Sequence, residues 1–260
     1  MEISLKIRLI SYFYTAICAA GTTNSIYRRA KSDICPAISP ALCACGMEIS
    51  MLKKYKWTMI STSIILIIPV IFGLVMWNSL PDMIPTHFDA ANNVNGWSSK
   101  GTAVLGIPLF MLAIQWLVFA VTASDPRRQN ISPRIQCLIL WITPVVSIVE
   151  AIVIYGTALG IDIDITLFVN ILLGIIFIVL GNYMHKVKQN YSIGVKISWT
   201  LNSEENWNRT NRMSSWLLII CGIAFIANAF LKTSYIPAIV IVLFLVVPFA
   251  YSYYLYRKGV

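Results

Sequence analysis

The stretch Trp57–Trp77, WTMISTSIILIIPVIFGLVMW, decides the fold of this chain. It contains no charged residue and has a tryptophan at each end. A helix needs about 20 mostly apolar residues to cross the hydrocarbon core of a bilayer, and amphipathic aromatic rings favour the two headgroup levels. The stretch is therefore predicted to be a transmembrane helix.

The rest of the chain repeats this pattern. Five more apolar runs are of similar character: Thr102–Thr122, Ile135–Tyr155, Ile165–Asn182, Trp216–Leu231 and Ile236–Tyr254. Of the 260 residues, 58% are hydrophobic and 12% are charged, whereas soluble domains have about 45–50% and about 25%. We therefore expect an all-α, six-helix transmembrane bundle in a bacterial cell membrane, with the lipid bilayer around it.

The basic residues predict the orientation of this bundle. Only Lys100 and Lys232 stand in the loops on one side. The opposite side carries Lys53, Lys54, Lys56, Arg127, Arg128, Arg134, Lys186, Lys188, Lys196, Arg209, Arg212, Arg257 and Lys258. Because cytoplasmic loops carry the excess of Lys and Arg, both termini are predicted to lie in the cytoplasm. The formal net charge of +9 then reflects topology, and no direct binding of nucleic acid is expected.

Residues 1–46 do not fit this scheme. Lys6 and Arg8 before the apolar segment 9–20 imitate a secretory signal, but its cleavage would export the following basic residues. The tetrapeptide Met-Glu-Ile-Ser at 1–4 recurs at 47–50. We therefore predict that residues 1–46 are a start-site extension or disordered, with a cleaved signal peptide as the alternative, and that residues 47–260 form the six-helix membrane domain.

The loop 79–101, between the first two apolar runs, is predicted to be short, ordered and extracellular. It contains LPDMIPTHFD at 80–89. Pro81 and Pro85 stop helix propagation, while the Asn-rich centre and Gly96 are typical of turns. His87 has the chemistry of a metal ligand or a pH sensor. Since no Cys or second His stands beside it, a structural hydrogen bond is the favoured interpretation.

The loop 183–214, between the fourth and fifth runs, is predicted to be polar and cytoplasmic. It combines aromatic and basic residues. Asn202 with Glu205 three residues later predicts a capping box, followed by a short helix from about Ser203 to Arg212. Trp207 and Met213 would project toward one face of that helix and lie on the membrane.

Both loops resemble those of one family. LPxxIPxHFD followed by WxSK, at 80–100, is similar to the extracytoplasmic loop of the SdpI-type membrane proteins, which are immunity and signalling proteins for sporulation-delaying peptide toxins. The pattern GNxM, NxxIGVK, WTL, W and NR, at 181–212, closely resembles the second signature of that family. The resemblance covers about residues 55–258. Departures from the usual residues are Asn92, Asn95, Lys196, Ile197, Ser198 and Asn206.

The resemblance implies two functional motifs and two partners. The outer-loop motif, expected to meet a peptide toxin, comprises Pro81, Pro85, His87, Phe88, Asp89, Trp97 and Lys100. The inner-loop motif, a candidate docking surface for a soluble transcriptional repressor, comprises Asn182, Asn190, Gly194, Lys196, Trp199, Thr200, Trp207 and Arg212. Aromatic and Arg side chains are common in interaction hot spots, but they also anchor membrane proteins. An inner loop that only orients the bundle is therefore the alternative.

Glu150 lies well inside the third apolar run. An ionisable group in hydrocarbon is costly and suggests a functional site. Two interpretations remain open. Glu150 is either a neutral structural residue, hydrogen-bonded to Asn170 or Asn228 or open to a polar cavity, or part of a proton or ion relay.

The sequence thus predicts a membrane immunity and signal-transduction protein that protects the cell against a secreted peptide toxin. The alternative is a small proton-coupled transporter centred on Glu150. No phosphate loop, zinc-protease motif, nucleophile elbow or dinucleotide fingerprint is found. We therefore predict no enzymatic activity, no cofactor and no metal site.

Overall fold

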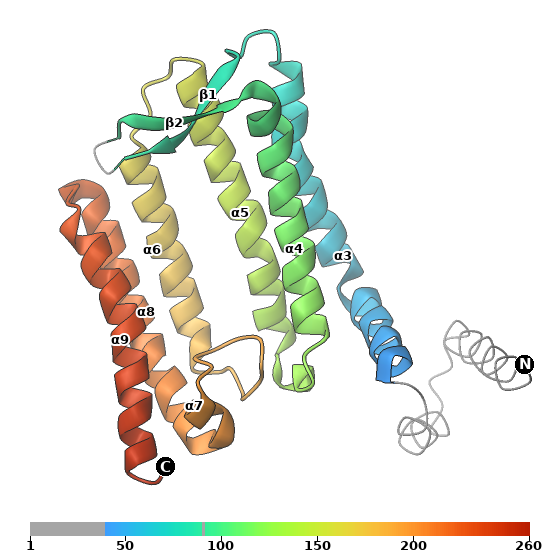
Figure 1. Ribbon diagram of the computed structural model, residues 1–260, viewed down its shortest axis with the longest axis vertical. Helices are drawn as coiled ribbons and strands as arrows, with labels where there is room; N and C mark the ends of the chain where they lie inside the picture. Colours follow the sequence, from blue (N-terminus) through green and yellow to red (C-terminus); the bar gives the residue numbers. More distant parts are fainter. Residues whose placement is uncertain (1–39, 90–91) are drawn as a thin grey trace, which may run out of the picture. The chain divides into compact units, whose positions relative to one another are not determined.

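The computed structural model describes residues 40–89 and 92–260, with the backbone alone for residues 40–50 (Figure 1). Most of the predicted extension, residues 1–39, lies outside the described residues, and residues 40–46 are helical. The chain divides into two compact units, residues 1–54 and 55–260. Every contact described below lies within the second unit.

Six helices among the described residues are long and apolar enough to cross a bilayer, which confirms the predicted number. They are α3 (Pro40–Val75), α4 (Ile107–Ala123), α5 (Pro133–Ala158), α6 (Ile165–Met184), α8 (Glu204–Leu231) and α9 (Tyr235–Arg257). Large apolar side chains are exposed along all of them. Such surfaces are stable in lipid, so the chain is a multi-pass membrane protein.

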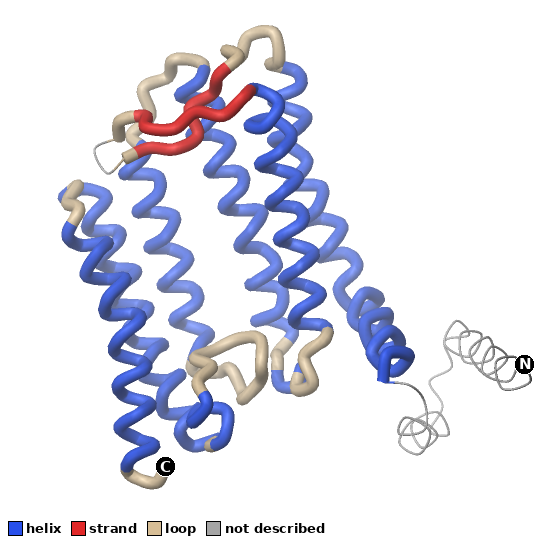
Figure 2. Tube along the Cα trace, in the orientation of Figure 1, coloured by secondary structure: helices blue, strands red, loops and turns tan. Residues whose placement is uncertain are grey.

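A β-hairpin connects α3 to α4 (Figure 2). Its strands β1 (Met83–Phe88) and β2 (Val94–Ser99) pair antiparallel, with Ile84 opposite Ser98 and register shifts between Pro85 and Phe88. Pro81 and Pro85 favour extended backbone before them, as expected, but strands were not predicted. After the hairpin, a π-helical turn, η2 (Thr102–Gly106), leads into α4.

Helices α6 and α8 pack backbone against backbone. A Cβ on Gly174 would lie 2.8 Å from the Gly222 carbonyl oxygen, and one on Gly181 would lie 2.8 Å from that of Ser215. Gly174 and Gly181 lie two helical turns apart on α6, and Ser215 and Gly222 lie two turns apart on α8. Small residues therefore line the seam between the two helices. Close approach through small residues is a typical way for membrane helices to associate.

The predicted start of the fifth helix was wrong. The N-cap of α8 is Ser203, whose hydroxyl accepts from the Asn206 N–H at 3.1 Å, instead of Asn202 with Glu205. No separate short helix ends at Arg212, because α8 continues without a break to Leu231. A one-turn helix, α7 (Ser198–Asn202), precedes it. In the following text, the end of the bundle that carries β1 and β2 is called the hairpin end, and the end that carries α7 is called the loop end.

Candidate functional site

The hairpin is anchored by apolar packing. Ile84 of β1 is 0% exposed and belongs to a cluster with Leu80, Val104, Ile154 and Tyr155. Pro85 beside it is also buried. These contacts hold β1 against α5 and the π-helical turn, so the hairpin has a fixed position on the bundle.

The exposed surface of the hairpin carries most of the outer-loop motif. Trp97 is 56% exposed, His87, Asp89 and Pro81 are exposed, and Phe88 is half-buried. His87 Nδ1 contacts the Asn95 amide oxygen at 2.5 Å, in agreement with the structural hydrogen bond that was favoured. This face therefore offers an aromatic, polar surface to a ligand.

Lys100 closes the base of the hairpin. Its ammonium lies 3.2 Å from an Asp82 carboxylate oxygen and 5.5 Å from the centre of the Trp77 ring. Its backbone N–H donates to the Asp82 carbonyl at 2.9 Å. Lys100 thus joins the two ends of the loop, and its side chain is half-buried.

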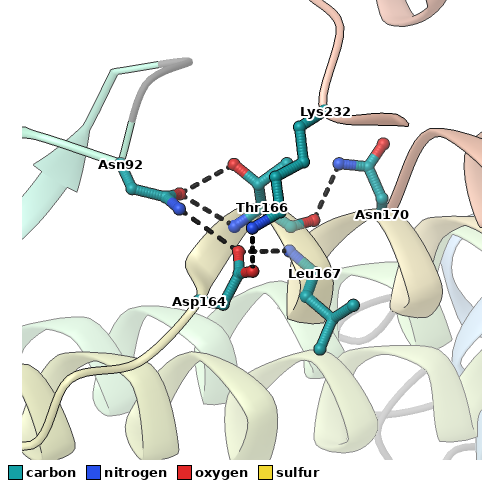
Figure 3. A network of polar contacts seen from close by, with 6 residues as sticks. All are labelled: Asn92, Asp164, Thr166, Leu167, Asn170 and Lys232. Atoms are coloured by element: carbon teal, nitrogen blue, oxygen red, sulfur yellow. Dashed lines mark hydrogen bonds and ion pairs between the residues drawn. The ribbon is translucent and has the colours of Figure 1, made fainter. Parts of the chain in front are cut away.

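The tip of the hairpin caps helix α6. Asn92 has a left-handed backbone with φ of 65°. Its side-chain oxygen accepts from the N–H and the hydroxyl of Thr166 at 2.9 and 2.7 Å, and its amide donates to Asp164 at 3.2 Å (Figure 3). The first N–H groups of a helix have no partner within the helix, so Asn92 satisfies one of them from a distant segment.

Asp164 links this cap to helix α8. One carboxylate oxygen accepts from the Leu167 N–H at 3.0 Å, and the other lies 2.6 Å from the Lys232 ammonium (Figure 3). The hydrogen bond from Lys232 and that from the Leu167 N–H lower the pKa of Asp164. Below it, the Asn228 amide donates to the Asn170 oxygen at 3.0 Å. Hairpin tip, α6 and α8 are therefore joined by one polar network, which sequence reasoning missed.

The inner-loop motif divides into buried and exposed residues. Trp207 is 0% exposed, and its indole N–H donates to the Val187 carbonyl at 2.8 Å. It therefore does not lie on the membrane, and that prediction was wrong. The backbone of residues 185–203 folds over it. Gly194 contacts it so closely that a Cβ there would lie 2.7 Å from the indole ring.

Two more residues of the motif hold the loop from inside. Asn190 and Thr200 are both 0% exposed. The Asn190 oxygen accepts from the N–H groups of Ser192 and Ile193 at 2.9 and 2.7 Å. The Thr200 hydroxyl lies 2.8 Å from the carbonyl oxygens of Val195 and Ile197. These side chains stabilise the loop fold and present no atoms to a partner.

Asp125, which the sequence did not single out, ties two loops together at the loop end. It is 3% exposed. Its carboxylate accepts from the Arg127 N–H at 2.7 Å, the Tyr191 N–H at 2.9 Å and the Ser192 hydroxyl at 2.6 Å. Arg127 in turn donates to Gln189 and lies over the Tyr191 ring. The loops after α4 and after α6 therefore form one platform.

The surface of this platform is basic. Lys196 in the loop after α6 is exposed, as are Asn182 of α6 and Arg212 of α8 at the same end of the bundle. Tyr191, in the same loop as Lys196, is also exposed. Trp199 is half-buried, with its ring 5.4 Å from Phe249, 5.5 Å from Tyr253 and 5.7 Å from Tyr256 of α9. The exposed part of the motif therefore consists of two cations and an amide, with the tail of α9 packed against the remaining aromatic.

Comparisons with known proteins find matches that include the outer loop and most of the inner loop. Residues 186–252 match the SdpI/YfhL protein family, and residues 64–112 match a domain of unknown function, DUF1648. The chain is 28% identical over 203 residues to the Immunity protein SdpI of Bacillus subtilis (strain 168), an alignment that covers 75% of this chain and 94% of that protein. The chain is thus similar to SdpI-type proteins, and it is a multi-pass bacterial membrane protein. No solved structure matches it.

The two matched segments fall on the two candidate surfaces. The SdpI/YfhL match covers the inner loop from Lys186, helix α8 and most of α9. The match to DUF1648 covers the last third of α3, the hairpin and the start of α4. Most of the residues that carried the resemblance lie within these two segments, whereas Asn182 lies just outside them.

Glu150 lies outside both matched segments. Asn170 and Asn228 hydrogen-bond to each other, so the predicted bond from either of them to Glu150 is not observed. Its oxygen Oε2 is buried and has no hydrogen-bond partner in the part of the chain that the structure describes. Within that part, no group of three or more His, Cys, Asp or Glu side chains is placed to hold a metal ion.

Proposed function

We propose that this protein is a membrane immunity protein of the SdpI type that protects its cell against a secreted, membrane-active peptide. The observation that carries the proposal is the match to the Immunity protein SdpI over 94% of that protein's length. The structure of the two loops supports this proposal, because the outer loop forms an ordered hairpin at one end of the bundle and the inner loop forms an ordered platform at the other. The role is one of binding and signalling, without catalysis.

The hairpin is the proposed contact for the peptide. The distribution of Lys and Arg favours an arrangement with both termini in the cytoplasm, which puts the hairpin end outside. Trp97 and His87 are exposed there on a strand pair fixed by Ile84. A rigid aromatic surface at the outer headgroup level is suited to a peptide that enters the membrane from outside.

The platform at the loop end is the proposed contact for a soluble repressor. Its exposed cations, Lys196 and Arg212, are suited to an acidic surface. Trp207, Asn190, Gly194 and Thr200 would act only by holding this surface in shape. The docking proposal therefore rests on fewer side chains than the sequence motif contains.

Survival of a sensitive Gram-positive strain tests the proposal. The strain is exposed to a sporulation-delaying-type peptide with and without expression of residues 47–260, and membrane insertion is checked in each culture. We expect survival to rise strongly with expression. Equal killing of both cultures, with the protein inserted, would reject the immunity role. The same comparison with the full 260 residues shows whether residues 1–46 are dispensable.

A small proton-coupled transporter is the second candidate function. The buried, unpartnered oxygen of Glu150 favours it, because such a group in hydrocarbon is a candidate proton carrier. This function predicts proton-linked flux that is lost in Glu150→Gln while survival against the peptide is unaffected. Flux in proteoliposomes and survival of the same variant separate the two candidates.

A further inference from the structure

An apolar groove lies between α3 and α5 near the hairpin end. It has a volume of about 360 Å³ and is lined by residues that include Ile68, Phe72, Ile152 and Ile161. These four side chains are 40–60% exposed, roughly half of each. Ile68 and Phe72 of α3 and Ile152 of α5 lie on membrane helices, where exposed apolar side chains face lipid, so the groove is accessible from the bilayer.

A much smaller cavity adjoins this groove. It is lined by Glu150 and Pro108 among others, and it has a volume of about 10 Å³, which is room for one group of the size of a water molecule. Pro69, Ala151 and Tyr155 line both the groove and the cavity. Ala151 is the smallest of these side chains, and it leaves the least bulk between the two spaces.

The polar side chains at the cavity, Glu150, Ser147 and Tyr155, can each accept a hydrogen bond. Glu150 Oε2 is buried without a hydrogen-bond partner among the described residues. The Tyr155 hydroxyl donates its proton to the Pro69 carbonyl at 3.1 Å, so its oxygen is left to accept. A ligand group that donates hydrogen bonds therefore matches all three side chains. A carboxylate in hydrocarbon is further stabilised by a group of opposite charge.

We propose that the groove and the Glu150 cavity together bind an apolar peptide segment that carries one amine, with the apolar part in the groove and the ammonium against Glu150. An ammonium is about the size of water, has three donors and supplies the missing positive charge. This inference rests on the proposed function, since it identifies where a membrane-active peptide binds within the bilayer. It adds a second contact to the one at the hairpin.

Photolabelling of the full chain in nanodiscs of zwitterionic lipid tests the site without any toxin. The two probes are an alkylamine and an alcohol with the same photoreactive chain, and labelled residues are mapped by mass spectrometry. We expect the amine to label the groove residues of α3 and α5 more strongly than the alcohol does. In Glu150→Gln this excess falls at least about tenfold, while labelling by the alcohol is unchanged.

Two further variants complete the test. Asp162→Asn removes an exposed carboxylate of the loop before α6 and is expected to leave both labels unchanged. Ala151→Leu fills the junction of groove and cavity and is expected to remove the excess of the amine label. If Glu150→Gln loses both labels, labelling of Glu150→Asp is measured next. A restored excess of the amine label over the alcohol label supports the site, and equal labelling by the two probes overturns it.

Equal labelling of the wild-type groove by both probes, or an undiminished excess in Glu150→Gln, overturns the inference. The survival assay is a separate readout. A protein that shows the amine excess but gives no protection against the peptide would contradict the proposed function and leave the site in place.

Discussion

The two signature loops of this chain use their motif residues in different ways. At the hairpin, anchoring is done by Ile84 and Pro85, and the residues Trp97 and His87 face outward. At the loop end, Trp207, Asn190, Gly194 and Thr200 are inside, and few motif side chains reach the surface. A sequence signature can therefore record either a binding surface or the internal support of one. The following variants test this difference.

Trp207→Ala is expected to have the largest effect. The side chain is fully buried and its indole N–H is hydrogen-bonded, so its removal leaves a cavity and an unpaired carbonyl at Val187. The loss of unfolding free energy should be about 3–5 kcal/mol. Trp97 is exposed and serves as the matched control. Trp97→Ala should change the free energy of unfolding by less than about 0.5 kcal/mol. Thermal unfolding in detergent measures both, and similar losses would contradict the assignment of Trp207 to the interior.

Gly194→Ala is expected to have the second largest effect on stability. The φ of 123° is rare for a residue with a side chain, and the new Cβ would lie 2.7 Å from the indole of Trp207. The expected loss is about 1–3 kcal/mol. Gly160→Ala is the control, because its φ is also positive at 81° but a Cβ there meets nothing within 4 Å. If both variants unfold at the same temperature, contact with Trp207 is not the cause.

Asn92→Ala tests the tip of the hairpin. It removes the cap on the Thr166 N–H and the bond to Asp164, and N-cap losses cost about 1 kcal/mol. Protection of the amides at the start of α6 against hydrogen exchange should fall. Asn95→Ala, on the exposed side of the same hairpin, should leave these amides protected. Unchanged exchange in Asn92→Ala would show that the tip contact does not hold α6.

Asp164 gives the smallest expected effect, and it depends on pH. The Lys232 hydrogen bond lowers its pKa in the folded protein. A lowered pKa contributes stability that is present above the unfolded pKa, about 3.9 for Asp, and that is lost as the pH falls through the folded pKa. Asp164→Asn should therefore lower the free energy of unfolding near pH 7. The stability of this variant should also change less than that of the wild type as the pH falls into the acid range. Parallel stability curves for variant and wild type from pH 7 downward would refute this.

The local parts of this architecture were readable from the sequence, and the long-range parts were not. Apolar runs such as Trp57–Trp77 predict helices because a bilayer sets their length. The strands, the cap by Asn92 and the bridging role of Asp125 depend on segments far apart in the chain, and no local pattern encodes them. Trp207 was misplaced because an aromatic beside basic residues is typical of a membrane surface, whereas here the loop before it folds back over the ring.

The α6–α8 seam is an intermediate case. Gly174 and Gly181, like Ser215 and Gly222, are spaced two helical turns apart. This spacing of small residues was visible in the sequence and is typical of closely packed membrane helices. The sequence did not predict that α6 and α8 would pack together, because this depends on the connection through residues 185–203.

Survival against the peptide, compared between variants of the two surfaces, tests the central claim most directly. Trp97→Ala removes an exposed hairpin side chain, and the double variant Lys196→Ala with Arg212→Ala removes the exposed cations of the platform. All are surface changes, so the protein should stay folded and inserted. We expect Trp97→Ala to lose protection and the platform variant to keep it. Full protection by Trp97→Ala together with loss in the platform variant would contradict the account.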